Sequence, residues 1–146
     1  MHHVLFLCSG NYYRSRFAEA LFNHHAVAES WPWRAFSRGL AIHLAWGDIS
    51  PHAREALKDR GIDLAHTAPT RQKLTLADLA AADLVIALKE AEHRPLLRAL
   101  FPDWEDRVEY WHVDDLDCAT PEEALPGLEQ QVEELGRRLT ARPEVA

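Results

Sequence analysis

Cys8 and Arg14 stand near the start of the chain in the run CSGNYYRS. An ionised thiol can attack phosphorus, and a planar guanidinium can hold two phosphoryl oxygens during the attack. Between them, Gly10 and Asn11 are the residue types that most readily adopt positive φ, so the segment can bend until successive amides face inward. Such a row of amides binds anions and favours the thiolate. These residue types at this spacing therefore predict covalent phosphoryl transfer.

The same chemistry needs a proton donor, because an alkoxide or phenolate leaves poorly unless it is protonated. Late in the chain three carboxylates lie close together, at Asp114, Asp115 and Asp117. One of them could protonate the leaving group and, once ionised, activate the water that hydrolyses a phosphocysteine. The residue types alone leave the choice among the three open. A solvated acidic loop is the alternative interpretation.

The elements around Cys8 are those that such a site requires. Val4–Leu7 is a continuous apolar run, which is typical of a strand buried on both faces. A helix is predicted from about Ser15 to Glu29, because its apolar residues recur at helical spacing. Ligands of parallel sheets bind where a strand meets the next helix, and the helix N-terminus favours anions. The apolar stripe consists of Phe17, Ala18, Leu21, Phe22 and Ala26.

The rest of the chain continues to alternate strands and helices. Strands are predicted at 34–37, 84–88 and 108–112, with a weak candidate at 62–65. Helices are predicted at 51–61, from 75, over 90–100 and from near Pro126, where Pro-Gly interrupts an earlier capping signal. This order predicts a single domain over residues 1–146, folded as a three-layer α/β sandwich with about four parallel strands, flavodoxin-like in order.

Composition excludes several classes of protein. The 146 residues are 47% hydrophobic and 27% charged, and the net charge of −7 argues against a nucleic-acid or anionic membrane surface. No apolar run approaches the roughly 18 residues that span a bilayer, and no signal-peptide pattern is present. Two cysteines cannot form a disulfide framework, and the nine histidines have no zinc-ligand spacing with either of them. We expect a cytoplasmic monomer or weak dimer with no cofactor, metal, nucleic-acid or membrane partner.

The run Cys8–Ser15 resembles the phosphate loop of the low-molecular-weight protein tyrosine phosphatases, C-x5-R-[ST] with an internal Gly-Asn. The resemblance extends along most of the chain, through Ser37-Arg38-Gly39, Gly61-Ile62-Asp63 with His66, and Ala82–Ile86. It implies hydrolysis of phosphate monoesters through a phosphocysteine, acting on a phosphotyrosine-bearing protein or a small aryl phosphate.

The resemblance also implies roles for individual residues. Cys8 is the expected nucleophile, and Arg14 the phosphate binder. Ser15 is expected to donate to the thiolate, and Asn11 to hold the loop in its left-handed turn. The acid is placed at Asp115, with Asp117 and then Asp114 as alternatives. The expected phosphate- or substrate-binding residues are Ser9, Gly10, Asn11, Tyr12, Tyr13, Arg14 and Ser15.

The chain departs from the family pattern at several positions. Tyr13 replaces the second cysteine of the loop, Arg16 stands where a proline often follows the loop serine, and Leu116 replaces the proline after the acid. Tyr12 and Tyr13 are bulky, so tyrosine specificity is less secure than phosphatase chemistry.

Three further residues have predicted roles beside this site. His66 could brace the phosphate loop through a hydrogen bond, and Trp46 could wall the pocket or fill the core. Cys118 could reach an oxidised Cys8 and form a disulfide with it.

Two functions other than a phosphatase are alternatives for the same residues. A sister family reduces arsenate with the same loop, but Cys118 is the only remaining thiol, so an external thiol would have to complete that reaction. An inactive phosphate- or phosphoprotein-binding module is the other alternative. Retention of the nucleophile argues against it, because anion binding alone needs no thiolate.

Overall fold

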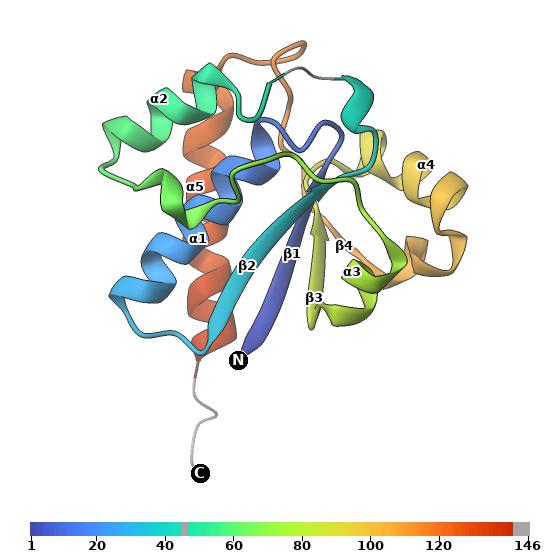
Figure 1. The fold of residues 1–146 in the computed structure, drawn as a ribbon, viewed down its shortest axis with the longest axis horizontal. Helices are drawn as coiled ribbons and strands as arrows, with labels where there is room; N and C mark the ends of the chain where they lie inside the picture. Colours follow the sequence, from blue (N-terminus) through green and yellow to red (C-terminus); the bar gives the residue numbers. More distant parts are fainter. Residues whose placement is uncertain (45–46, 142–146) are drawn as a thin grey trace.

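The computed structural model describes residues 1–44 and 47–141 and is built on a four-stranded parallel sheet (Figure 1). The strand order is β2-β1-β3-β4, which is the flavodoxin-like order expected. Cys8 ends β1, one of the two inner strands, where it pairs with Gly39. The predicted fold class is therefore confirmed. The strands are β1 His2–Cys8, β2 Trp33–Gly39, β3 Leu84–Ala87 and β4 Glu109–Tyr110.

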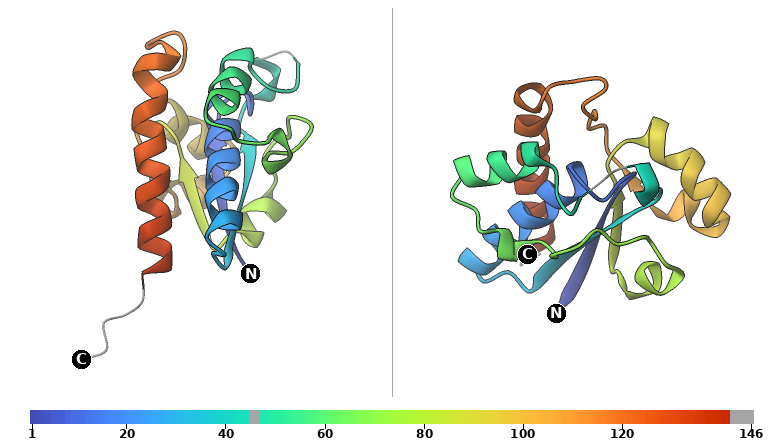
Figure 2. Two further views of the ribbon diagram at one scale, coloured as in Figure 1. Left: turned by 90° about the vertical axis from the view of Figure 1, so that its left-hand side faces the viewer. Right: turned by 45° about the horizontal axis from the view of Figure 1, so that its top comes forward.

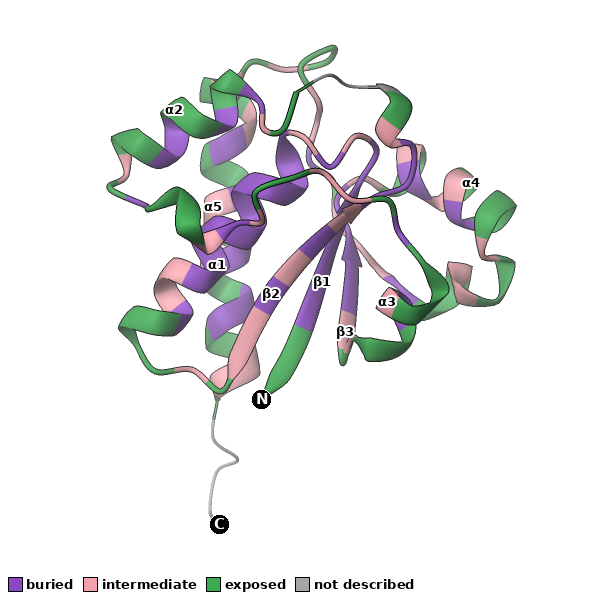
Figure 3. Cartoon of the chain, in the orientation of Figure 1, coloured by how far each residue is buried: buried purple, intermediate pink, exposed green. Residues whose placement is uncertain are grey.

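Helices cover both faces of the sheet and give the molecule three layers (Figures 1 and 2). The side chains of β1 alternate between two apolar clusters: Phe6 packs with the helices of one face, while Leu5 and Leu7 pack with those of the other. The residues of β1 from Val4 to Cys8 are therefore buried on both faces of the sheet (Figure 3). The first face carries α1 Arg14–Ala28, α2 Pro51–Asp59 and α5 Pro121–Thr140; the second carries α3 Leu76–Ala81 and α4 Glu90–Leu100.

Two of the expected elements are wrong. Residues 62–65 form no strand; instead Leu64–His66 is a 3₁₀ turn, because the Asp63 carboxylate accepts a hydrogen bond from the Ala65 amide and bends the chain. The last helix begins at Pro121 rather than near Pro126. Thr120 forms a full capping box, which outweighs the single intrahelical bond that Pro126 removes close to the helix start.

Other boundaries shift by only a few residues. The last strand is confined to Glu109–Tyr110, and the predicted helix over 90–100 has the expected bounds. The apolar stripe of α1 is buried throughout, as its spacing predicts. In the described part of the chain, no helix combines the length and apolarity needed to cross a membrane.

Candidate active site

The loop from Cys8 to Tyr13 turns its carbonyl groups outward. All six accept hydrogen bonds from outside the loop. No described residue accepts a hydrogen bond from the amides of residues 9–13. Buried amides are normally paired, so a consecutive unpaired row marks an anion-binding nest. The carbonyls of Cys8, Ser9, Tyr12 and Tyr13 accept from the amides of Leu40, Ala41, Ser50 and Phe17, and those of Gly10 and Asn11 accept from Arg71 and Arg16.

The end of β2 packs directly against this loop. A Cβ atom on Gly39 would lie 2.9 Å from the Ser9 carbonyl oxygen and 3.0 Å from the Asn11 Cβ. Only glycine permits this close approach. The glycine of the Ser37-Arg38-Gly39 segment therefore shapes the outer wall of the nest.

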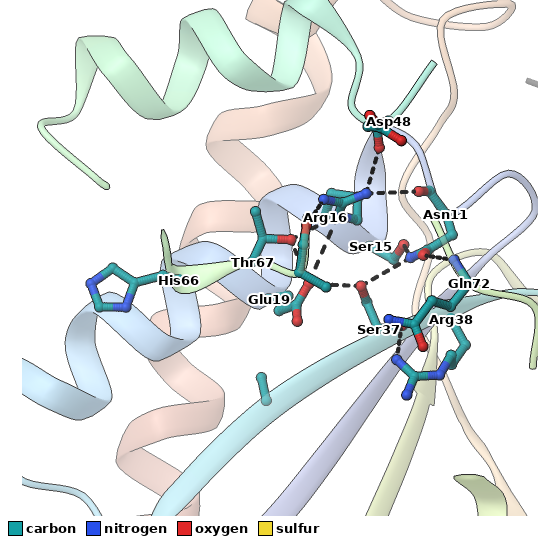
Figure 4. Close-up of polar contacts among 12 residues, drawn as sticks. Asn11, Ser15, Arg16, Glu19, Ser37, Arg38, Asp48, His66, Thr67 and Gln72 are labelled. Carbon is teal, nitrogen blue, oxygen red and sulfur yellow. Dashed lines mark hydrogen bonds and ion pairs between the residues drawn. The ribbon is translucent and has the colours of Figure 1, made fainter. Parts of the chain in front are cut away.

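Cys8 is buried, with its Sγ 2.9 Å from the Oγ of Ser15. Asn11 adopts a φ of 50° and donates through Nδ2 to the hydroxyls of Ser15 and Ser37, both at 2.9 Å (Figure 4). Because the Ser15 oxygen already accepts from Asn11, its own proton is free to point at the sulfur. The structure thus brings together the residues that we expected to stabilise a thiolate.

Arg14 is buried beside the loop. Its Nη1 donates to the Val113 carbonyl at 3.0 Å, and its Nη2 donates to Glu92 at 2.5 Å and lies 3.4 Å from Asp115. Burial opposes the positive charge of Arg14, yet its pKa is raised above the ordinary value because Cys8 and Glu92 stabilise that charge. The guanidinium is therefore a fixed cation in this site.

Glu92 is a site residue that the sequence analysis missed. Its Oε2 accepts a 2.5 Å hydrogen bond from Ser9 as well as the bond from Arg14, and it lies 2.8 Å from His93 Nε2. The pKa of Glu92 is held far below its ordinary value, first by the contact with His93 and then by the guanidinium and hydroxyl donors. In the sequence, an acidic residue in the first turn of a helix is explained by the helix dipole alone, so nothing singled Glu92 out.

His93 is fully buried next to this carboxylate. Its Nδ1 accepts a 3.0 Å hydrogen bond from the Lys89 amide. Burial lowers the pKa of His93, so the imidazole is neutral near pH 7. It therefore lies against Glu92 without adding charge to the site.

A cavity of about 800 Å³ opens over the loop. It contains polar groups around the sulfur and apolar side chains at its rim, which suits a ligand with a charged head and an apolar body. Asn11 and Ser15 lie behind the loop and do not line it. Its lining residues are Cys8, Ser9, Gly10, Tyr12, Tyr13, Arg14, Glu92, Pro95, Leu96, Asp115, Leu116 and Asp117.

The structure narrows the choice among the three late carboxylates. Asp115 and Asp117 line the cavity. Asp114 instead pairs with Lys89 Nζ at 2.8 Å, and this hydrogen bond lowers the pKa of Asp114. Asp114 therefore does not line the cavity, and its carboxylate is held by Lys89.

Tyr13 is buried, and its hydroxyl has no hydrogen-bond partner among the described residues. Burial, followed by the negative charge of Asp115, raises the pKa of Tyr13 to about 12. The phenol is therefore protonated near neutral pH.

The remaining candidates lie elsewhere. The His66 ring packs against His24 at 5.9 Å between centroids and points away from the loop (Figure 4). Cys118 is exposed and lines a neighbouring cavity. A disulfide between Cys118 and an oxidised Cys8 stays a prediction. Trp46 is outside the described residues. Within the described ranges, no group of three or more histidine, cysteine, aspartate or glutamate side chains is arranged to hold a metal ion.

Comparison with known proteins gives relatives of three activities. The chain is 34% identical over 106 residues to the protein-arginine-phosphatase of Bacillus subtilis, covering 72% of this chain and 67% of that one. It is 30% identical over 138 residues to an arsenate reductase of Halalkalibacterium halodurans, covering 93% and 91%. A low molecular weight protein tyrosine phosphatase from T. tengcongensis superposes with a TM-score of 0.72 at 29% identity, over 95% of each chain.

The sequence model of one protein family matches nearly the whole chain, over residues 3–142. The matched region contains the loop, the acidic segment, β2, β3 and β4, and all of β1 except its first residue. The chain therefore belongs to the low molecular weight phosphotyrosine protein phosphatase family.

Proposed function

We propose that this protein hydrolyses phosphorylated protein side chains through a phosphocysteine on Cys8. The observation that carries the proposal is the row of amides without a protein acceptor in the loop that follows Cys8, a loop that lines one cavity together with Cys8 and the Arg14 guanidinium. Amides and guanidinium together can hold the phosphoryl oxygens as negative charge spreads over them. No comparable arrangement is needed for a structural thiol.

The reaction proceeds in two displacements. The Cys8 thiolate attacks phosphorus, so an S–P bond forms as the bond to the leaving atom breaks. That atom takes a proton from an aspartic acid in the acidic segment, Asp115 by our sequence prediction. The resulting carboxylate then removes a proton from water as the water attacks the phosphocysteine. Phosphate leaves, and the thiolate and the protonated acid are restored.

Phosphotyrosine is the first substrate candidate. The cavity rim carries Pro95, Leu96 and Leu116, and Tyr12 offers an aromatic face. Aromatic rings gain from apolar burial and from offset or edge contacts with one another. These side chains suit an aryl leaving group, such as a phosphotyrosine side chain or a small aryl phosphate.

Phosphoarginine is the second candidate, and a different observation favours it. The cavity contains three carboxylates, on Glu92, Asp115 and Asp117, against the single guanidinium of Arg14. These carboxylates can attract a leaving group that is itself a guanidinium. The 34% identical relative is a protein-arginine-phosphatase, which supports the same substrate.

A turnover panel separates these functions. Wild type and Cys8→Ser are assayed with a phosphotyrosine peptide, a phosphoarginine peptide, a generic aryl phosphate, and arsenate with glutathione. We expect phosphate release from at least one phosphorylated peptide, and none with Cys8→Ser. Arsenate-dependent thiol consumption alone would support the reductase alternative. Tight peptide binding with no turnover from pH 5 to 8 would support an inactive binding module.

The identity of the acid gives a sharper prediction. Replacing the acid by asparagine removes the proton donor, so turnover should fall about 100-fold or more for esters with poor leaving groups and much less for esters with good ones. We expect this pattern for Asp115→Asn. Asp117 lines the same cavity, so Asp117→Asn tests whether that residue is the acid instead. Asp114→Asn is the matched control, because Asp114 pairs with Lys89. Steady-state rates over a series of aryl phosphates show which aspartate is the acid. If the rate depends more steeply on the leaving group in Asp117→Asn than in Asp115→Asn, the acid is Asp117.

A further inference from the structure

The two central carbonyls of the phosphate loop differ from the other four, because their partners are charged side chains. Arg71 Nη1 lies 3.3 Å from the Gly10 carbonyl oxygen, and Arg16 Nη1 lies 3.5 Å from that of Asn11. Both contacts are long for a hydrogen bond, so the attraction is mainly that of a cation for a carbonyl dipole. Neither arginine belongs to the C-x5-R run that carries the family resemblance.

Arg16 is a buried cation anchored on several sides (Figure 4). Its Nε donates to Thr67 Oγ1 at 2.7 Å, and its two Nη groups donate to the carbonyls of Asp48 and Ala68. It therefore joins the phosphate loop to the segments that precede α2 and follow the 3₁₀ turn. Thr67 and Arg16 occupy the bracing position that we expected of His66.

The charge of Arg16 is only partly balanced. The nearest carboxylate, on Glu19, lies 3.9 Å away and accepts hydrogen bonds from the hydroxyls of Ser37 and Thr67. Burial is the main cause that raises the pKa of Glu19, which weakens it as a counter-charge. A guanidinium stays protonated even when buried. A positive charge is thus held directly behind the loop.

Arg71 makes a similar set of contacts from the other side. Its Nε donates to the Gly47 carbonyl at 2.5 Å, and its Nη1 donates to the Ile42 carbonyl as well as approaching Gly10. The side chain is only partly buried. Arg71 therefore ties the same loop to the segment that follows β2.

These contacts bear on anion binding because each carbonyl shares a peptide group with the next amide. The Gly10 carbonyl belongs to the peptide of the Asn11 amide, and the Asn11 carbonyl to that of the Tyr12 amide. A cation on the outer oxygen polarises the peptide group and makes the inward N–H more positive. The same cation attracts a phosphoryl group or a thiolate on the inner side.

We propose that Arg16 and Arg71 form an arginine clamp, which positions the phosphate loop and strengthens its anion site from behind. Both are positioning residues, since neither lines the cavity. The proposal rests on the proposed role of the loop in binding a phosphoryl group. The charged groups that line the cavity with Cys8 are Arg14, Glu92, Asp115 and Asp117; behind the loop they are Arg16, Arg71, Glu19 and Asp48.

The test uses two readouts that need no turnover. Orthophosphate affinity is measured by calorimetry, and the rate of Cys8 alkylation by iodoacetamide is measured against pH in a Cys118→Ser background. The variants are Arg16→Gln, Arg16→Lys, Arg71→Gln and Arg71→Lys. Arg60→Gln is the control, because Arg60 is a partly buried arginine that bonds to Glu129 and the Ala56 carbonyl away from the loop.

We expect each glutamine variant to weaken phosphate binding by about three- to tenfold and to move the alkylation midpoint upward by about half a pH unit or more. The lysine variants should keep the midpoint near that of wild type, because they keep the charge. Arg60→Gln should change neither readout.

Arg71 keeps the proposal falsifiable if the buried Arg16 proves essential for folding. A folded Arg71→Gln variant with wild-type phosphate affinity and an unshifted alkylation midpoint would overturn the clamp. So would glutamine variants that lose only thermal stability. Wild type that binds phosphate but shows no turnover would count against the proposed function and not against the clamp.

Discussion

Cys8→Ser should lose turnover of every phosphorylated substrate by at least about 10⁴-fold, because a serine hydroxyl in this nest is a far weaker nucleophile than a thiolate. The hydroxyl is close in size to the thiol, and Ser15 and the loop amides remain in place. Orthophosphate binding should therefore persist within about tenfold of wild type. Steady-state kinetics and calorimetry on the same preparation measure the two effects.

If Cys8 is the nucleophile, Cys8→Ser must lose turnover while it keeps orthophosphate binding. A Cys8→Ser variant that retains more than about one hundredth of wild-type turnover would contradict a phosphocysteine pathway. Cys118→Ser is the matched control, since it removes the other thiol, which is exposed and lies outside the Cys8 cavity. Rapid quenching of wild type with labelled substrate should trap the phosphate on Cys8.

Arg14→Lys should lower turnover by about 10²- to 10³-fold, although it keeps a positive charge. Lysine cannot reproduce the planar fork, which now reaches the Val113 carbonyl and the Glu92 carboxylate together. Both kcat and phosphate affinity should fall, because the guanidinium contacts the phosphoryl oxygens before and during the attack. Initial rates with an aryl phosphate, together with phosphate calorimetry, provide the measurement.

The effect of Arg14→Lys on thermal stability must be separated from its effect on turnover. Lysine keeps the charge of Arg14 but cannot reach the Val113 carbonyl and the Glu92 carboxylate together, so one buried acceptor loses its donor and the thermal midpoint should fall. The Arg14→Lys/Glu92→Gln double variant removes the carboxylate that would lose its donor, while Asp115 remains near the lysine as a counter-charge, so part of the stability should be recovered. If the double variant also recovered turnover, Arg14 would be a structural residue and not a phosphate binder.

Much of the fold could be predicted from the sequence because its signals are local. The apolar run of β1 and the stripe on α1 each depend on side chains within a few positions, and both are buried as their patterns predict. The start of α5 could not be decided in this way. Its capping box and Pro126 give opposite signals, and the sequence does not show that the capping box outweighs the one bond that Pro126 removes.

For the candidate site, the loop that contains Cys8 and Arg14 could be predicted from the sequence, because strand, turn and helix are contiguous in that segment. The side chains around this loop could not, because they come from distant parts of the chain. Glu92 contacts Arg14 across 78 positions, Arg16 contacts Thr67 across 51, and Arg71 reaches Gly10 across 61. Such partners leave no periodic or spacing signal, because the packing of distant elements brings them together. For the same reason, the pairing of Asp114 with Lys89 could not be predicted from the sequence.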